Sequence, residues 1–289
     1  MAEILKTVVI TGPTATGKTA LAVWLARIFN GEIVSVDSRQ VYRGMDIGTG
    51  KDLDEYGEVP YHLIDIADPA REEYNLARFL PDAYRAIREI VERNHVPILC
   101  GGTALYLAAL LDGYRLPGGA LPPRCAGVPR VRQNPEAADS FTPPFGLDPL
   151  LIGVYYPRSE VHARIEARLD SRLSDGLVDE VRKLHEERGI SFEKLEFFGL
   201  EYREVSRYLK GECTLLEMRN QLLYRIRQFA KRQDIFFRKL EREGHQIYWL
   251  EKGREPDPRK LVEAFLCEEP LPAPGRRMCE TFYGKEPRA

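Results

Sequence analysis

The sequence lacks the features that mark membrane and secreted proteins. No apolar run in its 289 residues approaches the roughly 20 residues that a membrane-spanning helix needs. The opening stretch, MAEILKTVVITG, leaves no room for a signal peptide ahead of the first expected strand. The five cysteines are odd in number and widely spaced, without a C-x-x-C pair, which argues against a zinc site or a disulfide framework. We therefore expect a cytoplasmic protein with reduced thiols and no membrane partner.

An excess of charge of one sign is also lacking. The chain has 42 Lys and Arg against 44 Asp and Glu, which gives a net charge of −2. Any contact with nucleic acid must therefore come from a local basic patch. The five histidines follow no spacing typical of a metal site or a catalytic triad. Hydrophobic residues at 44% and charged residues at 30% are ordinary for a globular protein, and no internal repeat is present.

The first part of the chain alternates between short β-branched runs and stretches with apolar residues at helical spacing. This pattern predicts strands at 7–11, 32–36, 61–66 and 96–100, and helices at 18–29, 75–94 and 103–113. Asn30 with Gly31 is a C-cap signal for the first helix, and Asn75 is a good N-cap for the second. Such an alternation implies right-handed crossovers and a parallel sheet covered on both faces. We predict an α/β fold in which residues 1–114 form the first part of the core.

The second part of the chain changes character after residue 114. Residues 115–149 hold eight prolines and little periodicity, which predicts a loop. Residues 150–269 are expected to complete the core and to form a largely helical C-terminal part, with strands at 150–156 and 246–250 and helices at 159–173, 176–188, 199–211, 214–241 and 259–267. Residues 270–289 have the composition of a disordered tail.

A phosphate-binding loop lies between the first strand and the first helix. Gly12, Gly17, Lys18 and Thr19 fit the pattern G-x-x-x-x-G-K-[ST] in the strand-to-helix context that its mechanism requires. Backbone N–H groups from Thr14 to Lys18 would converge on phosphate oxygens at the positive end of the helix. Lys18 adds a point charge, and the Thr19 hydroxyl can hold Mg²⁺. The candidate phosphate ligands are thus Gly12, Pro13, Thr14, Ala15, Thr16, Gly17, Lys18 and Thr19.

The position of the nearest acid bears on which phosphate compound is bound. A phosphoryl-transfer enzyme of this type usually has an apolar strand that ends in a metal-holding Asp. The matching strand, VPILC, ends at Cys100 without that acid. A carboxylate follows the second strand instead: Asp37, at the edge where α/β sheets bind ligands. The alternative is that Asp37 only caps a turn through Ser38 and Arg39.

Several stretches in the same order resemble the tRNA dimethylallyltransferase family, also called tRNA isopentenyltransferase. The resemblance is close over residues 7–113 and looser over residues 151–250. The motif DSRQVYRG, followed by IGT, is far more specific than the phosphate loop, and GGTALYL and RQFAKRQ follow it in the family's order. The stretches are GPTATGKTALA (12–22), GEIVSVDSRQVYRGMDIGTGK (31–51), VPYHLIDI (59–66), VPILCGGTALYLAALLDG (96–113) and RIRQFAKRQDIFFR (225–238).

The resemblance implies a P-loop NTPase-like fold and a prenyl transfer. Members move a dimethylallyl group from its diphosphate to the exocyclic amine of an adenine beside the anticodon, and release pyrophosphate. No ATP need be hydrolysed, which accounts for the absent acid on the strand VPILC. By similarity, Asp37 is the general base, while Thr103 and Arg227 hold the diphosphate as its charge develops. Three further residues line the adenine's side of the reaction channel: Ser38, Arg39 and Gln40.

The long C-terminal helix carries a basic face. Arg227, Lys231 and Arg238, with the neighbouring Arg232, place cations within one turn of each other or on the same side. This face is expected to contact tRNA, although an ordinary solvated face is the alternative. The aromatic residues interleaved with it are expected to pack in the core rather than to stack on bases: Phe229, Phe236 and Phe237.

The chain departs from the family between residues 115 and 149. Typical members carry a longer, mostly helical insertion that grips the anticodon stem-loop, with an R-x-x-R-A-L-E stretch; this chain has only Arg130, Arg132 and Gln133 in a proline-rich segment. Free adenine nucleotides are therefore an alternative acceptor. A small-molecule kinase and a non-catalytic RNA-binding relative are further alternatives, and the intact Lys18 and Asp37 argue against the latter. We predict tRNA as acceptor, dimethylallyl diphosphate as donor, Mg²⁺ as cofactor and a monomeric protein.

Overall fold

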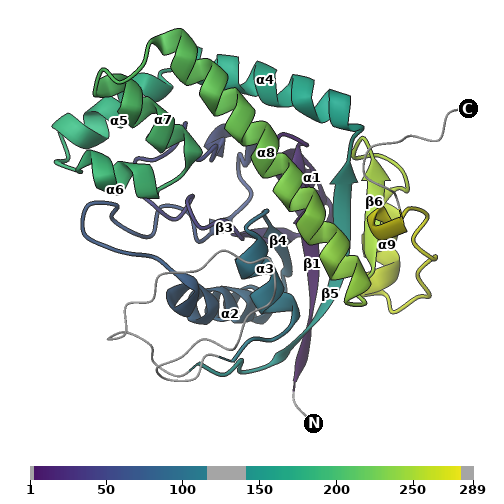
Figure 1. Cartoon of the computed structure of the whole chain (residues 1–289). Helices are drawn as coiled ribbons and strands as arrows, with labels where there is room; N and C mark the ends of the chain where they lie inside the picture. Colours follow the sequence, from purple (N-terminus) through teal and green to yellow (C-terminus); the bar gives the residue numbers. More distant parts are fainter. Residues whose placement is uncertain (1–2, 116–140, 281–289) are drawn as a thin grey trace, which may run out of the picture.

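The strands form one parallel sheet. The computed structural model describes residues 3–115 and 141–280 of the chain (Figure 1). Within these residues the strand order is β3-β2-β4-β1-β5-β6, and every neighbouring pair is parallel. This confirms the predicted α/β class. The strands are β1 (Ile4–Thr11), β2 (Gly31–Ser35), β3 (Tyr61–His62), β4 (Val96–Cys100), β5 (Gly146–Tyr155) and β6 (Ile247–Glu251).

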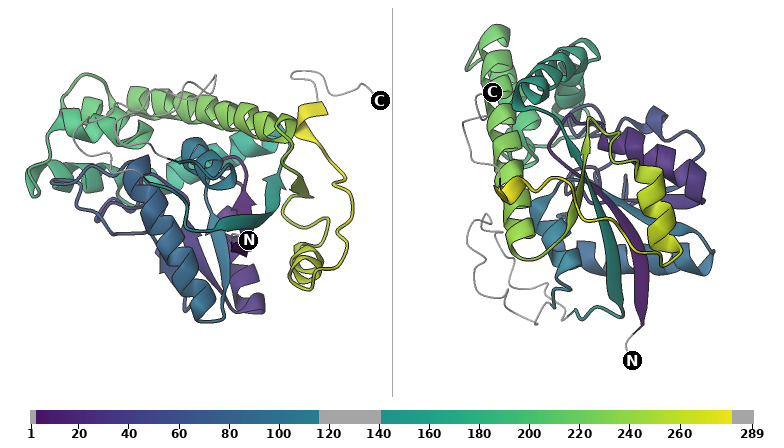
Figure 2. Two further views of the ribbon diagram at one scale, coloured as in Figure 1. Left: turned by 90° about the horizontal axis from the view of Figure 1, so that it is seen from below. Right: turned by 90° about the vertical axis from the view of Figure 1, so that its right-hand side faces the viewer.

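Helices cover both faces of the sheet. On one face pack α1 (Lys18–Phe29) and α9 (Pro258–Leu266); on the other pack α2 (Leu76–Glu92), α3 (Ala104–Leu111) and α8 (Leu215–Arg242). The right-hand view of Figure 2 shows α8 on one side of the strands, with α1 and α9 on the other. The C-terminal part consists of α4 (Arg158–Ser174), α5 (Leu177–Glu186), α6 (Phe192–Phe197), α7 (Leu200–Leu209) and α8 (Leu215–Arg242).

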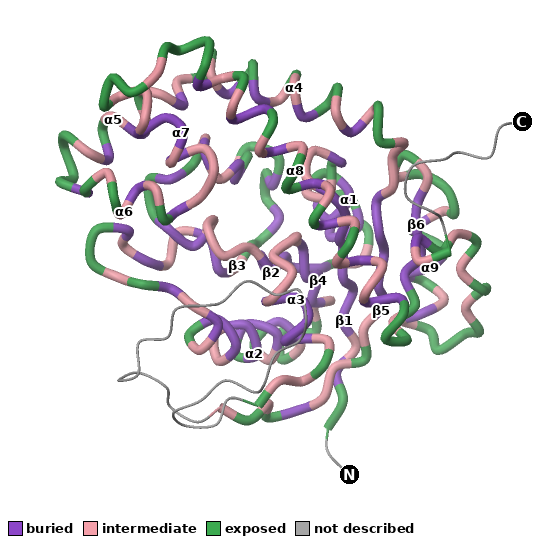
Figure 3. Tube along the Cα trace, in the orientation of Figure 1, coloured by how far each residue is buried: buried purple, intermediate pink, exposed green. Residues whose placement is uncertain are grey.

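The central strand β1 shows why the sheet needs both layers. Val8 and Ile10 belong to the apolar cluster under α1 and α9, whereas Val9 belongs to the cluster on the opposite face. All three are at most 1% exposed, because successive side chains of a strand point to opposite faces. Figure 3 shows the central strands buried along nearly their whole length. The loops at the carboxyl ends of the strands are therefore held on a rigid base.

Local sequence signals fix the ends of several helices. The Asn75 side chain accepts hydrogen bonds from the backbone N–H groups of Ala77 and Arg78, which caps α2 as predicted. Asn30, with φ of 51°, ends α1 in the left-handed region. At the start of the 28-residue α8, Thr214 and Glu217 form a reciprocal capping box.

Two predicted boundaries are wrong. The strand expected at 61–66 pairs only over Tyr61–His62, because Leu63 and Asp65 have φ of 62° and 56° and turn the chain out of the sheet. The loop expected over 115–149 ends early, since β5 begins at Gly146. Pro149 is tolerated inside β5 because β6 begins to pair only at Leu151, so that β5 is an edge strand at that point.

The segment after α9 also differs from its prediction. The tail expected from residue 270 is ordered as far as residue 280, and Met278 is 5% exposed. The carboxylate of Glu241 on α8 holds this segment in place. Its oxygens accept hydrogen bonds from the N–H groups of Met278 (3.1 Å) and Cys279 (2.6 Å) and from the Trp249 ring (2.7 Å). Residues 281–289, and the central part of the proline-rich segment with Arg130, Arg132 and Gln133, lie outside the described residues.

Candidate functional site

Three turns meet at the carboxyl ends of neighbouring strands. Val36, after β2, donates its N–H to the carbonyl of Cys100 at 2.8 Å, and Thr103 donates to the carbonyl of Val36 at 3.3 Å. Gly101 donates to the carbonyl of Ile10 on β1 at 3.2 Å. We call these turns the phosphate loop (residues 12–19, after β1), the acidic turn (residues 37–40, after β2) and the glycine turn (residues 101–103, after β4).

Glycine is required at two points of this junction. Gly12 has φ of 142°, and a Cβ atom there would lie 2.8 Å from the carbonyl oxygen of Val154 on β5. A Cβ atom on Gly101 would lie 2.3 Å from the carbonyl oxygen of Val36. Any side chain at either position would push the strand ends apart. The glycines of both motifs thus serve the close approach of three backbones.

The phosphate loop is held from inside and from outside. Within it, the hydroxyl of Thr16 donates to the carbonyl of Pro13 at 2.9 Å, as does the Lys18 ammonium at 2.7 Å. Burial lowers the pKa of Lys18 to about 8, although Asp37 partly offsets this effect. The sequence predicts that the N–H of Thr14 faces a phosphate oxygen. In the structure it donates instead to the Oε1 atom of Gln233 on α8 at 2.8 Å.

The acidic turn shows the capping role that was considered as the alternative for Asp37. Its Oδ1 atom accepts the backbone N–H of Arg39 at 2.8 Å and that of Gln40 at 3.4 Å, so this oxygen does cap the turn. Among the described residues, Oδ2 takes part in no hydrogen bond or ion pair. The carboxylate also lies near enough to Lys18 to favour the charged ammonium. One oxygen therefore holds the turn, and the other has no partner among the described residues.

Thr103 links the glycine turn to the acidic turn. It is the residue at which α3 begins, but its hydroxyl makes no capping bond. Instead the Oγ1 atom accepts the N–H of Ser38 at 3.1 Å. The structure therefore brings Asp37, Ser38 and Thr103, which are 66 positions apart at most in the sequence, to one place beside the phosphate loop.

The other two residues of the acidic turn act as braces. The Gln40 amide donates to the carbonyl of Gly50 at 3.0 Å and accepts from the hydroxyl of Ser35 at 2.8 Å, so it is not directed toward a substrate. The Arg39 guanidinium lies 5.1 Å from the ring centre of Phe197 on α6, and that ring is 58% exposed. Burial lowers the pKa of Arg39. The acidic turn is thus tied to the helical part of the molecule.

Three of the four predicted basic residues of α8 share one flank of the helix. Arg227 bonds the carboxylate of Glu166 on α4 at 2.8 Å, and among the described residues it makes no hydrogen bond to the phosphate loop or to Thr103. Lys231 and Arg238 lie on the same flank of the helix as Arg227, because they follow it by 4 and 11 residues. Arg232 lies on another flank, 6.0 Å from the ring centre of Phe229.

The aromatic residues of this stretch divide in the same way. Phe237 is fully buried, as expected for core packing, and Phe236 is half-buried. Phe229 is 38% exposed, so the expectation of core packing fails for this ring. One face of α8 therefore packs into the core, and the flanks of this helix carry the charged residues.

Sequence reasoning missed three side chains that contact the phosphate loop. Gln233 of α8 spans from the loop to the glycine turn, because its Nε2 atom donates to the carbonyl of Gly102 at 3.3 Å. Arg164 and Arg168, one turn apart on α4, reach the loop from another side: Arg164 donates to the carbonyl of Ala15 at 2.8 Å, and Arg168 donates to the hydroxyl of Thr14. The one-turn spacing of the two arginines was the available signal, but it does not say that α4 crosses the loop.

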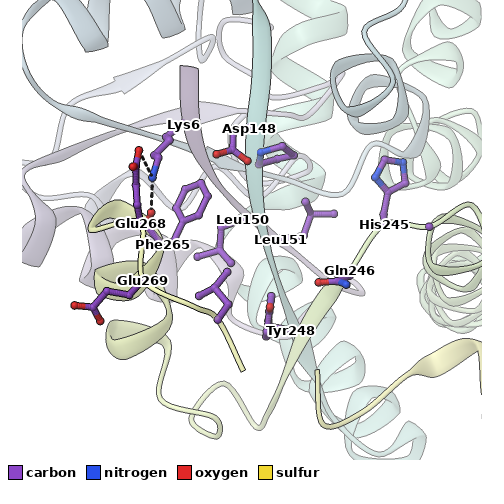
Figure 4. A pocket seen from close by; sticks show the side chains of 13 residues that line it. Lys6, Asp148, Leu150, Leu151, His245, Gln246, Tyr248, Phe265, Glu268 and Glu269 are labelled. Carbon is purple, nitrogen blue, oxygen red and sulfur yellow. Dashed lines mark hydrogen bonds and ion pairs between the residues drawn. The ribbon is translucent and has the colours of Figure 1, made fainter. Parts of the chain in front are cut away.

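Other features of the described residues lie away from this junction. A hollow of about 500 Å³ lies at the amino ends of β1 and β5, where Lys6 donates to the carbonyl of Phe265 at 2.7 Å (Figure 4). In residues 3–115 and 141–280 there is no group of three or more His, Cys, Asp or Glu placed to hold a metal ion. The same residues contain no helix long and apolar enough to cross a bilayer.

Comparison with family models gives two matches. Residues 40–142 and 126–240 match a family described as IPP transferase, and residues 5–58 match one described as isopentenyl transferase. The first match therefore begins at the last residue of the acidic turn and includes the glycine turn and nearly all of α8, and the second spans the phosphate loop and the acidic turn.

Individual proteins are similar over most of their length. A tRNA dimethylallyltransferase of Geotalea daltonii is 45% identical over 282 residues, which cover 86% of this chain and 91% of the relative. One from Treponema pallidum is 42% identical, with 84% and 90% covered. Among solved structures, a tRNA isopentenylpyrophosphate transferase from Bacillus halodurans has a TM-score of 0.71 at 31% identity, with 93% of this chain and 96% of that chain covered.

Proposed function

Because this chain belongs to the IPP transferase family, we propose that it transfers a dimethylallyl group from dimethylallyl diphosphate to an adenine next to the anticodon of a tRNA. One observation carries this proposal: Thr103 accepts the N–H of Ser38 at 3.1 Å, and so fixes the carboxylate of Asp37 beside the phosphate loop. A base and a phosphate cradle in one place are what a prenyl transfer with a diphosphate leaving group requires.

The reaction forms one bond and breaks one. The exocyclic nitrogen of the adenine attacks the first carbon of the dimethylallyl group, and the bond from that carbon to the diphosphate oxygen breaks. The electron pair leaves on the diphosphate. The Asp37 carboxylate takes the proton that the nitrogen loses, through the Oδ2 atom that the turn does not use. Its fixed Oδ1 atom keeps the base in one orientation.

The phosphate loop holds the leaving diphosphate. Its cation, Lys18, and the N–H groups that follow Thr14 offset the charge that develops on the departing oxygen. Thr103 contributes its hydroxyl at the edge of this site. Arg227 is assigned the same role by family resemblance, and to fill it the guanidinium must exchange Glu166, now 2.8 Å away, for a phosphate oxygen.

Mg²⁺ fits the oxygen donors of this site. The Thr19 hydroxyl, in the first turn of α1, makes no hydrogen bond among the described residues, and hydroxyl and phosphate oxygens are the ligands that Mg²⁺ prefers. We propose that Thr19 and the diphosphate hold the ion. When bound, it would neutralise part of the diphosphate charge, while the residues described above hold the substrates and move the proton.

A kinase reaction is disfavoured by the end of β4. Burial raises the pKa of the Cys100 thiol to about 12, so a neutral thiol stands where a phosphoryl-transfer enzyme of this type places a metal-holding carboxylate. For the acceptor, the names of the relatives and the basic flank of α8 support tRNA over a free adenine nucleotide.

One incubation tests the proposal. Labelled dimethylallyl diphosphate is mixed in parallel with unmodified tRNA, AMP, ADP and ATP, and label is counted in each acceptor. We expect incorporation into tRNA, none above background into the nucleotides, and loss of the signal in Asp37→Asn. Efficient labelling of AMP or ADP with none on tRNA would contradict the assigned acceptor, and ATP hydrolysis that depends on Lys18 would support the kinase instead.

A further inference from the structure

The face of α4 that crosses the phosphate loop carries a row of arginines. Arg164, Arg168 and Arg172 follow one another at intervals of one turn. Arg164 is exposed and donates to a backbone carbonyl, while Arg172 is 8% exposed and lies against Gly50. Arg168, between them, is half-buried and reaches Thr14 in the middle of the loop.

Among the described residues, no carboxylate forms an ion pair with Arg168. Its only hydrogen bond among the described residues goes to the neutral hydroxyl of Thr14, although a guanidinium has five N–H donors. The carboxylates of Glu201 and Asp52 are near enough to favour the charged form, but neither makes an ion pair with it within residues 3–115 and 141–280. Burial and the neighbouring Arg172 lower its pKa to about 10.

A second cation stands on the same loop. The Lys18 ammonium lies on the carbonyl of Pro13, and the charge of Arg168 disfavours its protonated form. Two partly desolvated cations that repel each other are unfavourable in the folded protein unless an anion joins them. A guanidinium presents its N–H donors as a planar fork. An anion that offers two oxygens to this fork, as a phosphate group does, is therefore bound best.

We propose that Arg168 is a second cation of the phosphate site and binds the oxygens of a diphosphate group directly. It bonds the hydroxyl of Thr14, whereas Gln233 accepts the N–H of that residue. Together with Lys18, it offsets the negative charge of the diphosphate after the prenyl group has left. The inference rests on the proposed function only for the identity of the diphosphate compound.

Calorimetric titration with inorganic pyrophosphate tests this inference. Arg168→Gln should weaken binding by about 10- to 100-fold, because charge-assisted hydrogen bonds to a phosphate are lost. Arg168→Lys should fall between this variant and the parent, since a point charge replaces the fork. Arg182→Gln on α5, a surface arginine paired with Asp179 one turn away, serves as the control and should bind as the parent does.

Two further readouts separate binding from a structural role. The unfolding midpoint of Arg168→Gln without ligand should equal or exceed that of the parent, because an unpaired cation is removed. Thr14→Val should weaken pyrophosphate binding by less than about tenfold. Unchanged binding with a lowered midpoint in Arg168→Gln would overturn the inference, as would a Thr14→Val variant that binds as poorly as Arg168→Gln.

Titrations with dimethylallyl diphosphate and ADP identify the source of the diphosphate. A matching loss for dimethylallyl diphosphate supports the donor, whereas a loss confined to ADP would overturn that assignment. The transfer assay on the parent protein is scored separately. If the parent transfers no prenyl group but Arg168→Gln still binds pyrophosphate more weakly, the proposed function is wrong and the role of Arg168 is supported. If the parent transfers normally but Arg168→Gln binds pyrophosphate as the parent does, the proposed function is supported and the role of Arg168 is wrong.

Discussion

The two ends of the sheet use charge in opposite ways. At the amino end, the carboxylate of Glu32 on β2 is 3% exposed and accepts hydrogen bonds from Arg93, His62 and His95 at 2.6 to 2.9 Å. These partners, Arg93 above all, lower the pKa of Glu32 to about 2. Every oxygen of that carboxylate is paired, and no element of the predicted site lies there.

At the carboxyl end, by contrast, the cations of the phosphate loop are not paired with carboxylates. Lys18 and Arg168 bond a carbonyl and a hydroxyl, and neither forms an ion pair among the described residues. The Asp37 carboxylate spends one oxygen on its own turn. Charge that is fully compensated serves the fold, whereas cations left without counter-ions mark the end of the sheet that awaits an anion.

The largest expected effect comes from removing the base at the carboxyl end. Asp37→Asn keeps the turn, since the amide oxygen can still accept the N–H groups of Arg39 and Gln40, but it cannot take a proton. Turnover of tRNA prenylation should fall by about 10²- to 10⁴-fold, with little change in donor affinity. Near-normal turnover would show that Asp37 only caps its turn.

Removal of the loop's own cation should cost less. Lys18→Ala should reduce kcat/KM for dimethylallyl diphosphate by about 10²-fold, because the leaving diphosphate loses a stabilising charge. The unfolding midpoint should hold, since the Lys18 ammonium has no carboxylate partner in the described structure. A large fall in the midpoint with kinetics unchanged per folded molecule would assign this lysine to the fold.

A smaller effect is expected at Arg227, where the two uses of charge meet. Its ion pair with Glu166 resembles the compensated amino end, but its proposed role is to bind diphosphate. Arg227→Lys keeps the charge and loses the fork, so kcat/KM should fall by about tenfold. Glu166→Gln, which frees the guanidinium, is the matched comparison and should not reduce donor affinity. Equal activity of the parent and Arg227→Lys would place this arginine on the solvated face.

A substitution at the amino end of the sheet should lower stability and leave turnover unchanged. Glu32→Gln should lower the free energy of unfolding at pH 7 by about 2 kcal/mol, through loss of charged hydrogen bonds. Because the folded pKa lies below the ordinary 4.5, this stabilisation is present above pH 4.5 and is lost as the pH falls toward 2. Urea unfolding at several pH values should therefore show the parent and the variant converging in acid. A constant difference down to pH 3 would contradict the assigned cause.

The sequence predicted this fold well where the information is local. The phosphate loop, the caps at Asn75 and Asn30 and the strand core of β1 depend on neighbours in the chain, and all were predicted. The failures have long-range causes. Pro149 is acceptable in β5 only because β6 pairs further along, and α6, with six residues, is too short to show helical periodicity.

The candidate site divides along the same line. Asp37 and Thr103 could be placed together because both follow strands of one parallel sheet, and the carboxyl ends of such strands meet at one edge. Gln233 and Arg168 could not be placed, because they lie 219 and 154 positions from the loop residue they contact. Their positions depend on how α8 and α4 pack over the sheet, which no local pattern specifies.

The proposal on which the assigned reaction depends is that the phosphate loop holds a departing diphosphate rather than a nucleotide that is hydrolysed. Its most direct test is the stoichiometry of a single reaction mixture with the protein, tRNA, Mg²⁺ and labelled dimethylallyl diphosphate, without any nucleoside triphosphate. Prenylated adenine and released pyrophosphate are quantified together. We expect equal amounts of the two products at every time point. Transfer that requires added ATP, or orthophosphate formed in step with the product, would contradict it.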